Sequence, residues 1–271
     1  MKTDNKKDSY RRRNNKINVI KIGGNVIEDE AKLTAFLKDF AAIDGQKVLV
    51  HGGGKLATLL AEKLGIPAKM HQGRRITDAQ TLEVITMVYG GLTNKNIVAK
   101  LQGFGCNAVG LSGADANTIV AHKRPVRAID YGFAGDIDHV DGFNIKKLLE
   151  IGLTPVFCAI SHDKNGQLLN TNADTIAAEV AIALSEFFDT TLYYCFEKNG
   201  VLRNVEDENS VIEKIDKTAY NELKREGIIA DGMLPKMHNC FHALDNKVVK
   251  VCIGNATMFT NNRQLFTTLT L

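Results

Sequence analysis

Glycines and a lysine stand together where two strand-like runs end. Lys21 lies near the end of the run INVIKI and is followed two residues later by Gly23 and Gly24. The run KVLV ends in HGGG, which contains Gly53 and Gly54. Glycines let backbone N–H groups approach an anion, and a helix that starts at such a loop adds partial positive charge. Two such loops on neighbouring strands favour a phosphate-binding site over simple tight turns.

The second glycine loop also fits G-x-G-x-x-A, a pattern of dinucleotide-binding proteins. The acidic residue expected about 20 positions later, which would bind a ribose, is missing. Residues 71–75 are HQGRR, and the P-loop pattern G-x-x-x-x-G-K-[ST] is absent from the chain. A dinucleotide-dependent oxidoreductase is therefore a disfavoured alternative.

Further polar residues stand at two helix starts. Arg74 and Arg75 precede a long helical stretch. Arginine suits bidentate recognition of a carboxylate, although a surface basic pair fits the local sequence equally well. Asn170, Asn172 and Asp174 cluster at the start of another helix, where only one of them can be the N-cap. The other polar groups remain free to contact a ligand.

Lys236 stands just inside a helix in the segment DGMLPK, a place where a lysine is usually solvated. His238 and His242 follow it one turn apart. Because no third ligand is nearby, we expect surface histidines rather than a metal site. Five scattered cysteines without paired spacing indicate buried, reduced thiols rather than a disulfide framework or a zinc site.

Short apolar runs alternate with helical stretches along the whole chain. Runs that are apolar on both faces are typical of a mostly parallel sheet covered by helices. We predict an α/β fold, namely a three-layer α/β/α sandwich around a central, mostly parallel sheet. Ligands bind such sheets beyond the C-terminal ends of the strands, where the glycine loops lie. The runs are residues 47–50, 107–111, 154–160, 190–196 and 247–253.

The chain of 271 residues is long enough for one large α/β domain. We expect a basic flexible tail over residues 1–16 and a single domain over 17–271. The tail carries seven Lys/Arg against two Asp/Glu, and a solvated tail is favoured over one that binds nucleic acid. No apolar run could cross a bilayer and no signal-peptide pattern is present, so we expect a cytoplasmic protein without a membrane partner.

In this order and spacing, the segments KIGGN, HGGG, GRRIT, VGLSGADAN, GFAGDIDHVDG, NGQLLNTNADTIA and DGMLPK resemble the N-acetylglutamate kinase family of the amino-acid kinase superfamily. The resemblance runs from Ile17 to the C-terminus. K-x-G-G and HGGG occur across the superfamily, whereas G-x-R-x-T, N-x-N-A-D and G-M-x-P-K point to this family. The resemblance implies the amino-acid kinase fold and transfer of a phosphoryl group from MgATP to the γ-carboxylate of N-acetyl-L-glutamate. That reaction is the second step of arginine biosynthesis by the acylated route.

The resemblance also implies roles for single residues. Lys21 and Lys236 stabilise the transferring phosphoryl group, and Asp174 holds both lysines in position. Arg75 grips the α-carboxylate of the substrate, and Asn170 also touches the acylated amino acid. The first glycine loop, Gly23 and Gly24, and the second, Gly53 and Gly54, form the loops for phosphate and substrate, in which Gly24, Gly53 and Gly54 offer N–H groups.

The resemblance places acyl-glutamate in a lobe of about residues 17–165 and ATP in a lobe of about 166–271. Mg²⁺ is expected to be held mainly by the nucleotide phosphates, without a protein metal site. A free glutamate carboxyl has a pKa near about 4.3, so the attacking carboxylate is already ionised and needs no general base. The chemical task is to neutralise charge on the phosphoryl oxygens, which suits lysines and glycine amides.

The chain also departs from the family in ways that leave alternatives open. Residues 195–200 are CFEKNG in place of a T/S-D-V-x-G segment near the nucleotide. The acyl group could be succinyl, with Arg74 as the cation for its second carboxylate. The short polar N-terminal extension favours a homodimer that is insensitive to arginine. A non-catalytic amino-acid sensor on the same fold is a further alternative, disfavoured because Lys21, Asp174 and Lys236 are all retained.

Overall fold

The computed structural model describes residues 15–71, 73–230, 232–259 and 265–271. The predicted tail, residues 1–16, therefore lies outside the described residues except for Asn15 and Lys16. Lys16 opens the first strand, one residue before the predicted start of the domain.

An eight-stranded sheet forms the centre of the molecule, in the order β12-β14-β13-β11-β1-β2-β8-β5. All neighbouring strands in it are parallel except β13 and β14, which pair antiparallel. The strands are β1 (Lys16–Ile22), β2 (Gln46–His51), β5 (Ala108–Leu111), β8 (Thr154–Cys158), β11 (Asp189–Phe196), β12 (Lys214–Ile215), β13 (Lys250–Asn255) and β14 (Thr267–Leu269). The predicted central, mostly parallel sheet is confirmed.

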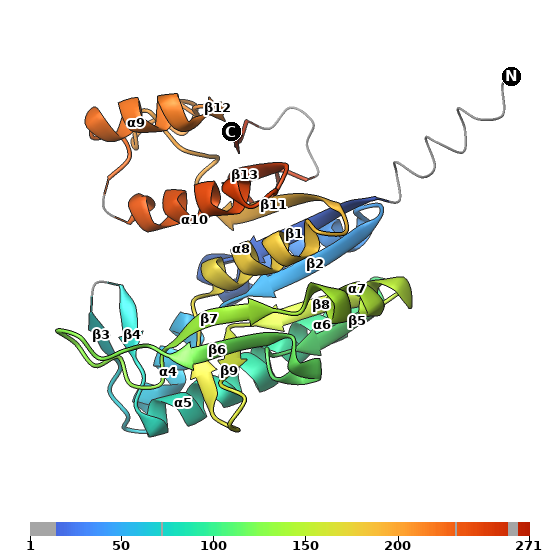
Figure 1. Cartoon of the computed structure of the whole chain (residues 1–271), viewed down its shortest axis with the longest axis vertical. Helices are drawn as coiled ribbons and strands as arrows, with labels where there is room; N and C mark the ends of the chain where they lie inside the picture. Colours follow the sequence, from blue (N-terminus) through green and yellow to red (C-terminus); the bar gives the residue numbers. More distant parts are fainter. Residues whose placement is uncertain (1–14, 72, 231, 260–264) are drawn as a thin grey trace, which may run out of the picture.

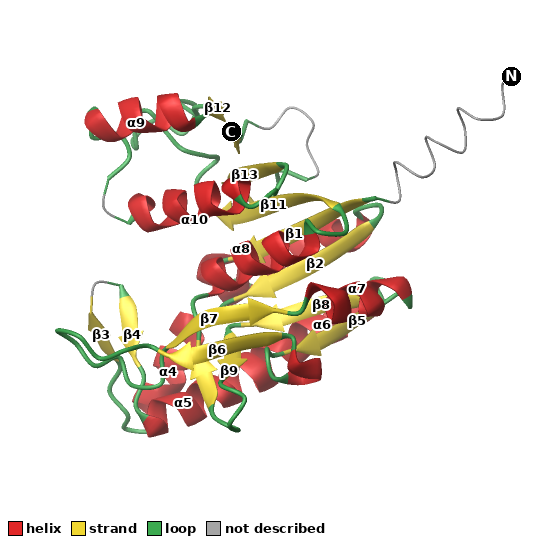
Figure 2. Ribbon diagram, viewed as in Figure 1, coloured by secondary structure: helices red, strands yellow, loops and turns green. Residues whose placement is uncertain are grey.

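Helices cover both faces of this sheet (Figures 1 and 2). One apolar cluster joins the sheet to α4 (Gly54–Lys63), α7 (Gly142–Glu150), α8 (Ala173–Leu184) and α10 (Met233–Asp245). A second cluster on the opposite face joins it to α3 (Glu30–Ala42) and α6 (Asn94–Gly103). Both faces of the central strands are thus buried, as in the predicted three-layer sandwich. In β1, Ile17 and Val19 belong to the first cluster, whereas Ile20 and Ile22 belong to the second.

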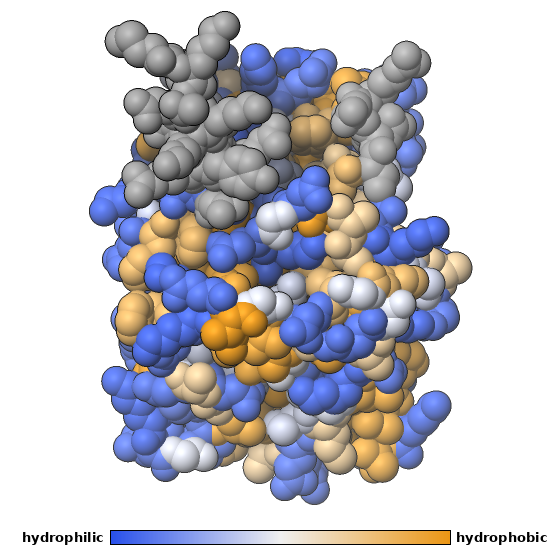
Figure 3. All heavy atoms as spheres, turned by 90° about the vertical axis from the view of Figure 1, so that its right-hand side faces the viewer, coloured by the Kyte–Doolittle hydropathy of each residue, from blue (hydrophilic) through white to orange (hydrophobic). Residues whose placement is uncertain are grey.

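A four-stranded sheet and a hairpin lie beside the central sheet. The four strands are ordered β10 (Leu168–Asn170), β9 (Ile160–His162), β6 (Ile119–Lys123) and β7 (Gly135–Val140), and the hairpin is β3 (Lys69–His71) with β4 (Arg74–Ile76). The other elements are α2 (Gly24–Glu28), the 3-10 turn η2 (Asp115–Asn117) and α9 (Lys217–Arg225). None of the helices in the described ranges has the length and apolar composition of a membrane span. On the side from which β1 starts, hydrophilic and hydrophobic residues are interspersed (Figure 3).

The long helical stretch predicted around residues 79–101 is helical throughout but changes type in its middle. It consists of α5 (Ala79–Ile85), a π-helical segment η1 (Thr86–Thr93) and α6. Asp78 caps its start by accepting a hydrogen bond from the Thr81 amide. π-Helical segments are rare and occur frequently at functional sites.

A buried histidine ties the end of β2 to α6. His51 is fully buried, and its Nδ1 lies 2.7 Å from the carbonyl oxygen of Gly52. Because a carbonyl only accepts, Nδ1 carries the proton and Nε2 is free to accept. The amide nitrogen of Asn94 lies 3.0 Å from that Nε2 and donates also to the carbonyl of Val156. Burial lowers the pKa of His51 from 6.5 to about 4, so the ring is neutral at neutral pH.

We predict that this histidine makes the fold sensitive to acid. Because the folded-state pKa of His51 is depressed, protonation favours the unfolded chain. The stabilisation is complete above pH 6.5 and is lost as the pH falls towards 4, with a total loss of roughly 3 kcal/mol. His51→Gln keeps an acceptor for Asn94 but cannot titrate. Urea unfolding between pH 7 and 4.5 should show a shallower loss of stability for His51→Gln than for the parent.

The control for this experiment is His139→Gln, because His139 is exposed on β7. Its unfolding free energy should follow that of the parent across the pH range. If the free energy of unfolding fell equally with pH in His51→Gln and in the parent, the role given to His51 would be contradicted.

Candidate active site

A buried ion pair joins the end of β1 to the start of α8. Side chains alternate along a strand, so Lys21 points to the same face as Val19, towards α8. Its Nζ lies 2.7 Å from Oδ1 of Asp174, and the two side chains are only 10% and 14% exposed. Asn172 is the N-cap of α8, because its side chain accepts from the amides of Asp174 and Thr175. The Asp174 carboxylate is therefore left for the lysine.

The second predicted lysine reaches the same place from α10. Lys236 is largely buried, and burial lowers its pKa while the nearby Asp174 carboxylate raises it. Lys21 and Lys236 both line one cavity of about 640 Å³, together with Gly23, Gly24 and Gly54. The structure thus brings the two lysines and both glycine loops together around Asp174.

The remaining wall of this cavity comes from the C-terminal part of the chain. Residues of the unusual segment CFEKNG contribute to it, including Phe196, Glu197 and Lys198. An apolar group of side chains completes the wall; its members are Val201, Leu202, Val205, Ile228, Met233 and Ile253. The cavity is therefore cationic at the end of β1 and apolar at the other side.

A second, polar cavity of about 270 Å³ meets the first at Gly54, which lines both. It is walled by the second glycine loop, by Arg74, Arg75 and Arg124, and by Asn170. Arg75 donates from Nη2 to the carbonyl oxygen of Gly54, at 2.9 Å, and to the hydroxyl of Thr58, at 2.7 Å. The loop and the guanidinium are therefore held in one arrangement.

The second glycine loop needs a glycine at position 53 for two reasons. Its φ is +155°, a region in which side chains are disfavoured. A Cβ at Gly53 would also lie 3.0 Å from the ring of Tyr89, which the π-helical segment η1 places against the loop. Tyr89 lines the polar cavity too. Its local sequence, MVYGGL, carries no sign of this role apart from the paired glycines.

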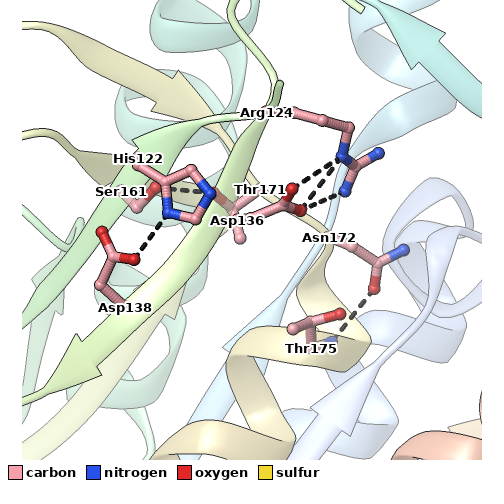
Figure 4. Close-up of polar contacts among 8 residues, drawn as sticks. All are labelled: His122, Arg124, Asp136, Asp138, Ser161, Thr171, Asn172 and Thr175. Carbon is pink, nitrogen blue, oxygen red and sulfur yellow. Dashed lines mark hydrogen bonds and ion pairs between the residues drawn. The ribbon is translucent and has the colours of Figure 1, made fainter. Parts of the chain in front are cut away.

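Arg124 is a second cavity residue that the sequence did not single out. Arg124 directly follows β6, and its guanidinium donates from Nε and Nη2 to the carboxylate of Asp136 on the neighbouring strand β7 (Figure 4). The pair raises the pKa of Arg124, and Arg124 lowers the pKa of Asp136. Arg74 adds to the lowering at Asp136, so it lies in the same electrostatic environment.

Asn170 lies on the wall of the polar cavity, as the resemblance implies for a residue that contacts the substrate. Its Nδ2 donates a hydrogen bond to the hydroxyl of Thr77, at 2.9 Å.

The two histidines of α10 lie close to each other. Nε2 of His242 lies 2.9 Å from Oε1 of Glu179, and the ring centroids of His238 and His242 are 6.5 Å apart. The described residues contain no group of three or more His, Cys, Asp or Glu that could hold a metal ion.

Known proteins are similar to the chain along most of its length. The sequence profile described as the Amino acid kinase family matches residues 16–255. A Bacteroides thetaiotaomicron protein named acetylglutamate kinase is 54% identical over 247 residues, which cover 91% of this chain and 96% of that protein. The acetylglutamate kinase of Cytophaga hutchinsonii is 54% identical over 242 residues, covering 89% of this chain and 92% of that protein.

Solved structures show the same fold. The smu.665 protein of Streptococcus mutans has a TM-score of 0.76 at 29% identity, with coverage of 94% of this chain and 98% of that one. The carbamate kinase of Giardia lamblia bound to AMP-PNP has a TM-score of 0.66 at 14% identity, with coverage of 94% and 98%. The profile match and the relatives above 50% identity show that the chain belongs to the amino acid kinase family.

Proposed function

We propose that the chain is an acetylglutamate kinase, which transfers the γ-phosphoryl group of ATP to the γ-carboxylate of N-acetyl-L-glutamate. The product is N-acetyl-L-glutamyl 5-phosphate, an intermediate of arginine biosynthesis. Relatives named acetylglutamate kinase that are 54% identical over about nine tenths of the chain support this activity. The observation that carries the proposal is the Lys21–Asp174 pair with Lys236 at the first cavity, which meets the polar cavity at Gly54.

The geometry suits the joining of two anions. The attacking carboxylate needs no base, so the site has to hold both reactants and neutralise charge on the phosphoryl oxygens in flight. Lys21 and Lys236 supply positive charge, and Gly24, Gly53 and Gly54 supply backbone N–H groups. Asp174 holds Lys21 in place, and its negative charge offsets the repulsion between the two ammonium groups.

The first cavity is suited to the nucleotide. Its apolar wall offers a surface for the base, and its lysines and glycines face the phosphates. We infer that Mg²⁺ is held mainly by the nucleotide phosphates, where it supplies charge neutralisation. Glu197 is the carboxylate of this wall, an oxygen ligand of the kind that Mg²⁺ prefers.

The polar cavity is suited to the acylated amino acid. Arg75 is proposed to bind the α-carboxylate, since its guanidinium is fixed by Gly54 and Thr58 and faces the cavity. Asn170 lies on the same wall and is proposed to contact the acylated amino acid. With the γ-carboxylate at Gly54, the substrate would point towards the lysines of the first cavity.

The test is a hydroxylamine-trapping assay for the acyl phosphate, with MgATP and N-acetyl-L-glutamate. The parent should form product, whereas Lys21→Ala and Lys236→Ala should each lower kcat at least about a hundredfold, the scale of losing one preorganised donor. Lys95→Ala is the matched control, because Lys95 lies on α6 outside both cavities and should leave kcat within about twofold.

Two results would count against the proposal. Absence of product in the parent would leave the amino-acid sensor as the better function for this fold. A Lys21 or Lys236 variant that keeps most of its kcat would remove that lysine from the site.

A second acyl group is favoured by one observation. Arg74 and Arg75, although adjacent in β4, both line the polar cavity, and Arg124 is the only one of its three arginines with a described carboxylate partner. The excess positive charge suits a substrate with an additional carboxylate, such as N-succinyl-L-glutamate. We therefore predict that Arg74→Leu lowers kcat/KM for N-succinyl-L-glutamate about tenfold more than for N-acetyl-L-glutamate, in the same trapping assay. Equal effects on the two substrates would exclude this role for Arg74.

We also infer that the chain forms a homodimer. Met87 and Leu92 are more than half exposed on the π-helical segment η1. Because they are five residues apart, they share one face of this π-helix, and exposed apolar side chains that lie together mark interaction surfaces. Light scattering should give about twice the chain mass of 29.7 kDa, and Met87→Glu with Leu92→Glu should shift the mass towards one chain. A hexamer, or a parent that is monomeric at micromolar concentration, would contradict the inference.

A further inference from the structure

Phe196 ends β11 beside the two lysines of the first cavity. Nζ of Lys236 lies 3.6 Å from the centroid of its ring, and Nζ of Lys21 lies 5.8 Å from it. The face of an aromatic ring carries partial negative charge and attracts an ammonium group within about 6 Å. Both lysines therefore lie within reach of one ring.

A second aromatic ring, that of Tyr194, supports the ring of Phe196. Phe196 stacks on Tyr194, with ring centroids 6.0 Å apart and an angle of 9° between the planes. Tyr194 is almost fully buried, and its hydroxyl donates to the carbonyl oxygen of Asp174 at 2.9 Å. In the sheet, Tyr194 is the register partner of Lys21. One strand thus fixes the ring relative to both the lysine and the helix that carries its counter-ion.

The ring of Phe196 is a close partner of the Lys236 ammonium group. Asp174 lies against Lys21, and within the described part of the chain Lys236 forms no ion pair. A second carboxylate at this place would hold Lys236 more strongly but would repel the phosphates. A ring face attracts the ammonium without carrying net charge, so the positive charge of Lys236 stays available to an anion.

We propose that Phe196 is a positioning residue, whose ring face holds the Lys236 ammonium, and more weakly that of Lys21, in the orientation needed for phosphoryl transfer. The proposal rests on the proposed kinase function and adds to it a residue of the unusual segment CFEKNG. It assigns to that segment a direct part in placing the two lysines.

The charge state of Lys236 depends on groups from several elements. Burial lowers its pKa, Asp174 on α8 raises it, and Lys21 on β1 lowers it. Glu197 after β11 also raises it, and the buried Cys240 thiol on α10, whose own pKa is raised, lies nearby in its neutral form. Removing the ring removes an attraction for the charged form only. The pKa of Lys236 should then fall further, and activity should be lost at a lower pH on the alkaline side.

The experiment compares Phe196→Leu with Phe196→Tyr, which keeps the ring. Phe196→Leu should lower kcat about tenfold and shift the alkaline limb of its pH profile to lower pH, with KM for N-acetyl-L-glutamate within about twofold. Phe196→Tyr should restore kcat and the pH profile. Phe143→Leu is the control, because it removes an exposed ring on α7 whose centroid lies 4.3 Å from Nζ of Lys147, and it should change neither kcat nor the pH profile.

A second measurement does not depend on turnover. Methylene protons next to an ammonium above a ring are shifted upfield, and several lysines of the described residues lie over rings. NMR of ¹³C-lysine-labelled protein should therefore show a set of upfield signals, of which the signal of Lys236 is assigned by its loss in Lys236→Arg. In Phe196→Leu the signal should move downfield and titrate at lower pH.

The outcomes separate the two proposals. Lack of product in the parent, with the upfield lysine signal present, would refute the kinase function but support the contact. Absence of that signal in the parent would overturn the proposal. So would a Phe196→Leu variant with unchanged kcat and pH profile, or a Phe196→Tyr variant as impaired as Phe196→Leu.

Discussion

The buried pairing of Lys21 with Asp174 is the constraint on which the rest of the site depends. Removing an ammonium and a carboxylate from water costs several kcal/mol for each ion, and only a close partner offsets this cost. The pairing fixes the end of the central strand β1 against the first turn of α8. The N-terminus of a helix also favours the negative charge of Asp174. Asn172 takes over the capping of α8, which leaves the carboxylate free for the lysine.

From this point the two cavities follow from the arrangement of the parallel strands. The loops after β1 and β2 emerge side by side because these strands are neighbours, and Gly54 lies where their cavities meet. Positive side chains and N–H groups converge there from β1, α4, β4 and α10. Two acidic side chains near this place are paired with cations, Asp174 with Lys21 and Asp136 with Arg124. The result is a site that attracts anions on both sides of one glycine loop.

The sequence predicted the layers and the central sheet because both depend on local periodicity. It predicted Lys21, Asp174 and Lys236 because each lies in a recognisable segment, and the structure brings the three together. Arg124 was missed, since its place depends on the register of β6 against β7, where Asp136 stands 12 residues away. Phe196 was noticed only as a departure from a pattern. Its meaning depends on a lysine 40 positions later, which no local pattern relates to it.

The π-helical segment η1 shows how far such dependence extends. Each residue of a π-turn advances the helix by a smaller angle than in an α-helix. The segment therefore determines in which direction each later side chain of this helical stretch points, a direction called here its rotational phase. Tyr89 meets Gly53 only in that phase, and Asn94 at the start of α6 meets His51 only in that phase. These two contacts therefore constrain the number of residues between Asp78 and Asn94. Loss or gain of one residue there would rotate the ring away from the glycine loop, although no residue of the loop itself had changed.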